Sequence, residues 1–171
     1  MQIEEAKEKL IQTFGALGTS WGVNRTMAQV HALLLISSKP LSAEEVMDAL
    51  QISRGNANMN LRALIDWGLV KKEHKAGERR EYFVAEKDMW RVAIQIIQER
   101  QKRELGPILQ ALQEIKNIEG EGEEEEKQKF VESVEKLDHI LSQANSFLDF
   151  VVKSEKSLLV GNLMRLVGKK R

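Results

Sequence analysis

The side chains with the clearest chemical capacity lie along residues 53–67, and they are hydrogen-bond donors rather than catalytic groups. On a helix successive residues turn by about 100°, which puts the larger apolar residues on one side: Ala57, Leu61, Leu64 and Ile65. The opposite side carries short or donor-bearing residues: Gly55, Asn56, Met59, Arg62 and Ala63. Amides and guanidinium groups pair with adenine and guanine edges, and short side chains let a helix enter a major groove. The segment therefore predicts a helix that reads base pairs.

The beginning of this helix offers a second kind of contact. Ser53 is a suitable N-cap residue, and Arg54 follows it in the first turn. Side-chain donors and free backbone N–H groups at a helix N-terminus can grip a phosphate. The DNA contacts expected from the whole helix are Ser53, Arg54, Gly55, Asn56, Asn58, Met59 and Arg62.

A basic hairpin is expected next, with strands at Leu69–Glu73 and Arg80–Val84 and a turn at Ala76–Gly77. From residue 53 to residue 80 there are seven Lys and Arg against three Asp and Glu, in a chain whose formal net charge is zero. Only such a local patch can attract a polyanion to a neutral chain. An arginine beside the turn can also enter a narrow minor groove, where negative potential is concentrated. The contacts expected from this wing are Lys71, Lys72, Lys75, Arg79 and Arg80.

Two helices are expected upstream of the reading helix and its partner. Apolar residues at three- and four-residue steps predict a helix over residues 2–17. We interpret Gly15, Gly18 and Gly22 as loosening the chain into a turn. The segment 24–36 then predicts an apolar helix of the core, with Asn24 as its N-cap.

The next helix begins with a capping box, in which Ser42 is followed three residues later by Glu45. This short helix, a turn, the reading helix and the hairpin outline a winged helix-turn-helix. The expected fold class is therefore mainly α with a small β-hairpin wing, extended by long C-terminal helices.

The C-terminal half is expected to be helical. A helical pattern runs over residues 87–104, and the Gly106-Pro107 pair predicts a kink or a break. A Glu- and Gly-rich stretch near residues 119–126 predicts a linker, since its carboxylates repel one another and stay solvated. We expect a DNA-binding domain over residues 1–86 and a helical dimerisation region over residues 87–171.

After the linker, apolar residues recur at steps of four and three for about three heptads: Phe130, Val134, Leu137, Leu141, Ala144, Leu148 and Val151. Such a seam packs either within one chain or between two copies. A helix of about 25 residues spans nearly 40 Å, too long for the N-terminal core to cover, which favours a homodimer joined by these residues. A last amphipathic piece, Leu158–Val167, precedes a basic tail.

Composition narrows the class of protein. The 171 residues are 42% hydrophobic and 30% charged with no cysteine, which excludes disulfides and thiolate chemistry. The first ten residues are charged where a signal peptide is apolar, and no apolar run approaches the roughly 20 residues of a membrane span. A cytoplasmic protein without membrane contact is expected.

The sequence offers no recognisable catalytic or metal site. His31, His74 and His139 are far apart in the sequence, and no nucleophile motif or phosphate-binding loop is present. We therefore expect no enzyme activity, no metal and no cofactor.

The segments around the hairpin carry a resemblance. They are WGVNRT at 21–26, LLIS at 34–37, PLS at 40–42, SRGNANMNLRAL at 53–64, WGLVKK at 67–72 and GERREYF at 77–83. Over about Gly18 to Arg103 the chain resembles the GbsR-type branch of the MarR transcriptional regulators. This resemblance implies a dimeric repressor-like protein with helix 53–67 in the major groove and Arg79 in the minor groove. The family usually has Asp before the wing arginine, to orient it, where this chain has Glu78.

Three tryptophans, Trp21, Trp67 and Trp90, fall at the joints between the reading module and its flanking helices. Ordinary core or hinge packing is one interpretation. The other is a small-molecule effector pocket, because some GbsR-type relatives are associated with choline-like effectors and aromatic rings hold quaternary ammonium groups.

Two hypotheses of different classes follow. The first is a sequence-specific regulator, a repressor, that binds double-stranded DNA at a near-palindromic site as a homodimer. The second is a winged-helix module that contacts another protein, with an incidental basic face.

Overall fold

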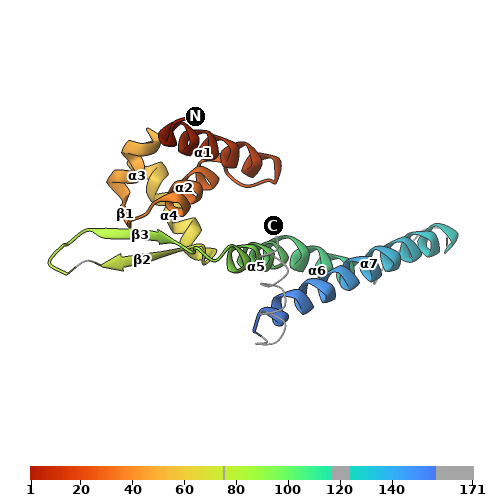
Figure 1. Ribbon diagram of the computed structural model, residues 1–171. Helices are drawn as coiled ribbons and strands as arrows, with labels where there is room; N and C mark the ends of the chain where they lie inside the picture. The colour runs from red at the N-terminus through yellow and green to blue at the C-terminus, as the bar shows by residue number, and fades with distance from the viewer. Residues whose placement is uncertain (75, 117–123, 157–171) are drawn as a thin grey trace. The chain divides into compact units, whose positions relative to one another are not determined.

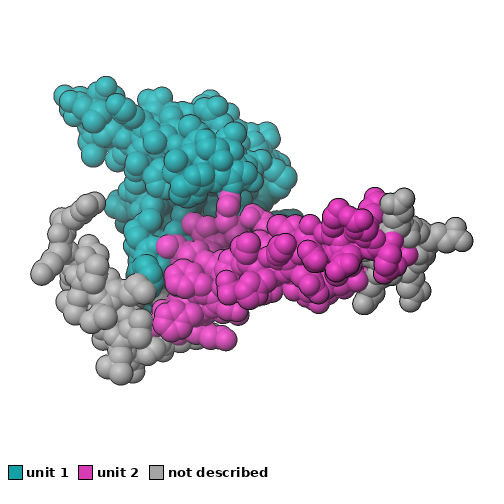
Figure 2. All heavy atoms as spheres, turned by 90° about the vertical axis from the view of Figure 1, so that its right-hand side faces the viewer, with its two compact units in different colours: residues 1–92 teal, residues 93–171 magenta. Residues whose placement is uncertain are grey.

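The computed structural model describes residues 1–74, 76–116 and 124–156. The chain divides into two compact units, Met1–Val92 and Ala93–Arg171, which Figure 2 colours separately. The functional division expected at residues 1–86 and 87–171 stays a prediction. Among the described residues, no helix is long and apolar enough to cross a membrane.

The first unit is a winged helix-turn-helix, which confirms the expected fold class (Figure 1). Its helices are α1 (Ile3–Ser20), α2 (Arg25–Ile36), α3 (Ala43–Leu50) and α4 (Arg54–Asp66), and its strands are β1 (Leu41–Ser42), β2 (Val70–His74) and β3 (Glu81–Ala85). The strands form one antiparallel sheet in the order β1-β3-β2. Strand β1 was not expected, because two residues are too few to show an alternating pattern.

Side-chain caps fix where three helices begin, as the sequence predicts. The Asn24 side chain accepts a hydrogen bond from the Met27 N–H at 3.1 Å. Ser42 and Glu45 form the full capping box, with bonds of 3.2 and 2.8 Å. Ser53 caps α4 by accepting from the Asn56 N–H at 3.3 Å. These bonds satisfy N–H groups that the helices leave unpaired, and so they set the register of the helix-turn-helix.

The interpretation of Gly15 and Gly18 as a loosened segment is wrong, because both lie within α1 and are buried. A methyl group on Gly18 would lie 2.6 Å from Cβ of Ala28, and one on Gly15 would lie 2.8 Å from Cγ of Gln29. The two glycines therefore let α1 and α2 approach closely. Of these three glycines, only Gly22 has the left-handed backbone of a turn, with φ of 71°.

Lys87 hydrogen bonds to backbone carbonyls at the C-terminus of α2. The Lys87 ammonium donates to the carbonyls of Leu34, Leu35 and Ser37 at 2.8, 2.6 and 3.0 Å. These are carbonyls that a helix C-terminus leaves unpaired. Burial lowers the pKa of Lys87. In the same helix, burial and the charge of Lys87 lower the pKa of His31 from 6.5 to about 4.

The described residues of the second unit form two helical segments. The first comprises α5 (Met89–Arg100), which begins in the first unit, the π-helical segment η1 (Gln101–Leu105) and α6 (Gly106–Ile115). The helix therefore continues through Gly106 and Pro107. Proline has no N–H to donate to the preceding turn, and the backbone immediately before it is π-helical rather than α-helical. The second segment is α7 (Glu124–Lys156), which carries three glutamates in its first turn.

Polar contacts join the two segments of this unit. The Lys116 ammonium lies 2.6 Å from the Asp138 carboxylate and lowers its pKa. The Gln101 amide donates to Asn145 and Asp149 at 2.8 and 2.6 Å. Most of the expected linker, and the piece Leu158–Val167, lie outside the described residues.

Candidate nucleic-acid interface

Helix α4 has one buried and one exposed face. Ala57, Leu61 and Leu64 are buried, with Asn60 among them, while Ile65 is half-buried. Gly55, Met59 and Arg62 are exposed, and Met59 is 57% exposed although it is apolar. The helix thus presents to solvent most of the face that the sequence assigns to reading. Asn56 and Asn58 lie at the margins of this face and are half-buried.

The N-terminus of α4 is open to solvent. Ser53 is exposed, and Arg54 is paired only loosely, with its guanidinium 3.5 Å from the Glu44 carboxylate of α3. These side chains are 71% and 47% exposed, so the pair contributes little to stability. A phosphate can therefore compete for Arg54.

Gly55 is not required by the packing of the protein. A methyl group built on it would meet no atom within 4 Å, and glycine in a helix is less favourable than alanine by about 1 kcal/mol. The residue leaves bare backbone on the outward face of the first turn. Bare backbone permits close approach by a ligand.

The buried side-chain amide of Asn60 hydrogen bonds to Asn56, which the sequence analysis did not predict. The Nδ2 of Asn60 donates to the backbone oxygen of Asn56 at 2.8 Å and to its Oδ1 at 2.7 Å. Helical phase alone would have put Asn60 on the side of Ala57, Leu61 and Leu64. An asparagine on a buried face is therefore the signal that could have revealed it.

The wing is the hairpin of β2 and β3. Each strand begins one residue later than expected, and the pairing runs from Val70 opposite Ala85 to His74 opposite Glu81. The connection between the strands contains Gly77, whose φ of 84° favours glycine. Among the expected wing contacts, Lys71, Lys72, Arg79 and Arg80 are exposed, and Lys75 lies outside the described residues. Lys72 is paired with Glu81 at 2.8 Å.

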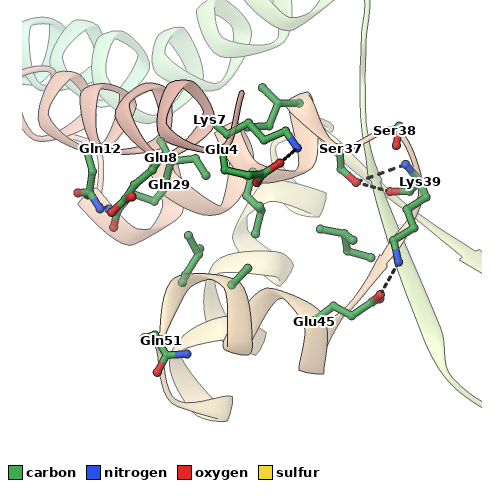
Figure 3. A pocket seen from close by; sticks show the side chains of 16 residues that line it. Glu4, Lys7, Glu8, Gln12, Gln29, Ser37, Ser38, Lys39, Glu45 and Gln51 are labelled. Atoms are coloured by element: carbon green, nitrogen blue, oxygen red, sulfur yellow. Dashed lines mark hydrogen bonds and ion pairs between the residues drawn. The ribbon is translucent and has the colours of Figure 1, made fainter. Parts of the chain in front are cut away.

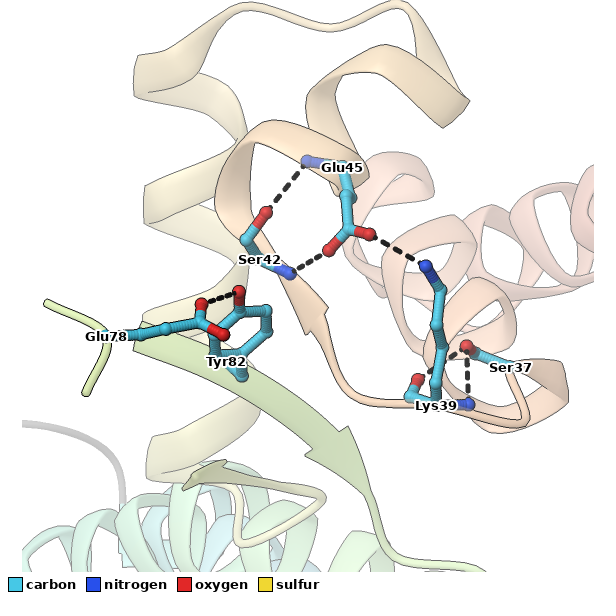
Figure 4. A network of polar contacts seen from close by, with 6 residues as sticks. All are labelled: Ser37, Lys39, Ser42, Glu45, Glu78 and Tyr82. Carbon is cyan, nitrogen blue, oxygen red and sulfur yellow. Dashed lines mark hydrogen bonds and ion pairs between the residues drawn. The ribbon is translucent and has the colours of Figure 1, made fainter. Parts of the chain in front are cut away.

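A network of polar contacts lies where strand β3 of the wing pairs with β1 (Figure 4). The hydroxyl of the buried Tyr82 donates to the Glu78 carboxylate, which raises the pKa of Tyr82. Tyr82 lies opposite Ser42 in the β1–β3 pairing, and Ser42 belongs to the capping box of α3. The Ser42 N–H is the main cause that lowers the pKa of Glu45. Glu78, which the resemblance assigns to the orientation of Arg79, therefore ties the wing turn to β3.

A groove of about 1010 Å³ opens between α1, α2 and α3 (Figure 3). Four of its charged residues form two ion pairs, Lys7 with Glu4 at 2.7 Å and Lys39 with Glu45 at 3.1 Å. Trp21, Trp67 and Trp90 do not line it. Trp21 is 59% exposed, and the Nε1 of Trp90 is buried without a hydrogen-bond partner among the described residues. The effector pocket at the three tryptophans stays a prediction.

The heptad seam of α7 is divided between two faces. Val134 is buried, whereas Phe130, Leu137 and Ala144 are exposed; Leu141, Leu148 and Val151 are half-buried. Three further large apolar residues, Ile140, Phe147 and Phe150, are each more than 60% exposed. At about 100° per residue, the large exposed residues fall on one side of the helix. We call them the α7 stripe: Phe130, Leu137, Ile140, Phe147 and Phe150.

Comparisons with known proteins find relatives of this chain among transcriptional regulators. Residues 21–81 match the model of the MarR family. The chain is 24% identical over 112 residues to "HTH-type transcriptional repressor GbsR" of Bacillus subtilis (strain 168), covering 66% of this chain and 62% of that protein. It is 24% identical over 94 residues to "HTH-type transcriptional repressor OpcR" of the same organism, covering 55% and 51%. The chain thus spans less than two thirds of either curated relative.

A solved structure shares the fold over most of the chain. It is described as "Crystal Structure of a transcriptional regulator" and superposes with a TM-score of 0.67 at 17% identity, covering 88% of this chain and 98% of that one. At this identity the likeness shows the fold alone. The resemblance to the MarR family that the sequence predicts is confirmed by the family match and by the two curated relatives.

Proposed function

We propose that the MarR family domain formed by residues 21–81 makes this chain a sequence-specific DNA-binding regulator, a repressor that acts as a homodimer on a near-palindromic operator. The observation that carries the proposal is the exposed face of α4. Its side chains are short or bear hydrogen-bond donors, the helix is capped at its N-terminus, and a basic wing follows it in the same domain. Both curated relatives are named transcriptional repressors.

The exposed face of α4 carries the side chains that a helix in a DNA groove needs. Arg62 can donate two hydrogen bonds to one guanine, and exposed Met59 offers an apolar contact of the kind a thymine methyl accepts. Gly55 lets the backbone of the first turn approach a phosphate or a groove wall. Reading helices contact base edges mainly through residues near their N-terminus, and Gly55 lies there, in the first turn of α4.

The wing supplies contacts that do not depend on base sequence. Arg79 and Arg80 are exposed beside the Gly77 turn, and Lys71 is exposed on β2. Their charges release counterions from DNA, so binding that uses them weakens with salt. Because the whole chain has a net charge of zero, this local attraction is modest for one copy.

Two copies would overcome that limit. Helix α7 has 33 residues, a length of about 50 Å, and the α7 stripe leaves large apolar side chains in water in the single chain. Exposed patches of this kind mark interaction surfaces. To face one near-palindromic site, the two α4 helices of such a dimer must lie about 34 Å apart, which is one turn of DNA.

The test is binding of the full chain to fragments of its own upstream region, followed by footprinting. The proposal expects a protected near-palindrome and affinity that falls with salt. Arg62→Ala should weaken binding by an amount that varies with sequence, roughly five- to 100-fold at its own base pair. Arg79→Ala should weaken all sequences alike and make the salt slope shallower. Lys153→Ala, which removes an exposed charge from α7, is the matched control.

A winged-helix module for protein contact gives a different result. It shows no protected site, and neither Arg62→Ala nor Arg79→Ala changes the retention of DNA.

Effector control is tested separately, by thermal shift with quaternary amines on the wild-type chain and on single variants of Trp21, Trp67 and Trp90. The absence of a shift with every amine would contradict a pocket at these residues.

A further inference from the structure

The pair of Asn56 and Asn60 sets the direction in which the reading face can hydrogen bond. Asn60 is only 2% exposed, among the apolar residues under α4. Its side chain donates to the backbone oxygen of Asn56 at 2.8 Å and to the side-chain oxygen at 2.7 Å. Asn56 lies one turn earlier, in the first turn of the helix and at the margin of its exposed face.

The backbone oxygen of Asn56 determines the orientation of the side-chain amides of both Asn60 and Asn56. A backbone carbonyl can only accept, so the atom of Asn60 that faces it must be the NH2 nitrogen. That nitrogen carries two hydrogens, one for each oxygen of Asn56. The side-chain oxygen of Asn56 is therefore turned toward Asn60, and its own NH2 group is turned away. If the Asn56 amide turned over, two NH2 groups would face each other and a buried donor would lose its acceptor.

We propose that Asn60 is a positioning residue that fixes Asn56 as a hydrogen-bond donor toward DNA. This inference rests on the proposed function and names the chemistry that the helix selects. A donor prefers base edges that offer acceptors in the major groove, which are N7 and O6 of guanine, N7 of adenine and O4 of thymine. It disfavours cytosine, whose edge there offers only an amino donor. A free asparagine would instead pair with adenine through both its oxygen and its nitrogen.

The experiment measures base preference rather than affinity alone. The full chain is allowed to select from duplexes randomised over its protected site, and the position read by Asn56 is the one whose preference disappears in Asn56→Ala. Wild type should prefer guanine to cytosine there by roughly tenfold or more. In Asn60→Ala this preference should fall at least fivefold, with an unchanged salt slope. In the Asn56→Ala background, Asn60→Ala should have no further effect on preference.

A second variant keeps the support and changes the outward group. Asn56→Asp still accepts from Asn60 and suits the first turn of a helix, but it turns an acceptor toward DNA. The preference between guanine and cytosine should therefore invert, and a ratio between two duplexes cancels the general repulsion of the added charge. The proposal is overturned if Asn60→Ala keeps the wild-type preference or if Asn56→Asp fails to invert it.

Amide hydrogen exchange by NMR tests the support without DNA. The side-chain NH2 of Asn60 should exchange slowly and that of Asn56 quickly, and Asn56→Ala should speed exchange at Asn60. Equal, fast exchange at both would contradict the inference. Failure of the proposed function looks different, because the wild-type chain would then select no duplex at all while the NMR result stands by itself.

Discussion

Tyr82 and Glu78 are joined by a hydrogen bond from the tyrosine hydroxyl to the carboxylate, which links the wing turn to strand β3. The ring of Tyr82 is buried, and Glu78 lies in the exposed turn just before the two wing arginines. The bond therefore ties the start of the Arg79-Arg80 segment to β3, and through the Ser42 pairing to the end of β1.

Removing this tie should weaken DNA binding without unfolding the domain. Tyr82→Phe keeps the buried ring but leaves the wing turn to be ordered on binding, which should lower affinity by roughly threefold to tenfold in a titration of the protected duplex. Glu78→Ala should have the same effect, and the double variant should be no worse than either single one. An unchanged affinity in Tyr82→Phe would contradict a role for the bond in the wing.

The close approach of α1 and α2 should be visible in stability. Gly18→Ala places a methyl group 2.6 Å from Cβ of Ala28, an overpacking that costs about 1–3 kcal/mol. The better helix propensity of alanine offsets about 1 kcal/mol of this cost. Urea denaturation should show a net loss in Gly18→Ala and recovery when Ala28→Gly is added. Equal stability of Gly18→Ala and wild type would show that the helices can separate freely.

His31 should make the protein sensitive to acid. Its pKa is about 4 when folded against 6.5 ordinarily, so the unfolded chain binds more protons between these values. The stabilising effect of neutral His31 is complete above pH 6.5 and is lost as pH falls toward 4. The shift corresponds to about 3 kcal/mol. Denaturation at pH 7, 5.5 and 4.5 should show this slope in wild type and in His139→Gln, whose histidine is exposed, but a smaller slope in His31→Leu.

The α7 stripe should hold two copies together. Phe147→Asp puts a charge into the α7 stripe, which the proposal places in an apolar interface, so sedimentation should show the 19.5 kDa single chain in place of the dimer. Ser142→Asp adds the same charge on the opposite side of α7 and should stay dimeric. DNA affinity should fall with the loss of the dimer. A wild-type chain that sediments as a monomer at binding concentrations would rule out this interface.

The sequence predicts the starts of helices better than the contacts between elements. Asn24, Ser42 and Ser53 are recognisable because a cap and its N–H partner are three residues apart, so local chemistry decides them. The roles of Gly15 and Gly18 depend on which helix approaches them, and that information is not local. Strand β1 exists only because Tyr82 and Phe83 lie opposite it.

The candidate site shows the same distinction. The exposed positions of α4 follow from helical phase, which the pattern of Ala57, Leu61 and Leu64 reveals. The support of Asn56 by Asn60 depends on an amide that is buried in spite of being polar. Helical phase indicates the buried position of Asn60 but not the oxygens to which it donates. In α7 the heptad pattern identifies an apolar helix but does not divide its seam between an inner face at Val134 and an outer one at Leu137.

The most direct test of the central claim, that α4 reads DNA, is the affinity of Gly55→Ala for the protected duplex, measured beside its free energy of unfolding. Nothing in the described protein contacts a methyl group at this position, so the unfolding free energy should stay equal or rise by up to about 1 kcal/mol. Affinity should nevertheless fall by roughly tenfold or more, because the added methyl group holds the first turn of α4 away from the DNA. A variant with wild-type affinity and wild-type stability would contradict the placement of this helix in the groove.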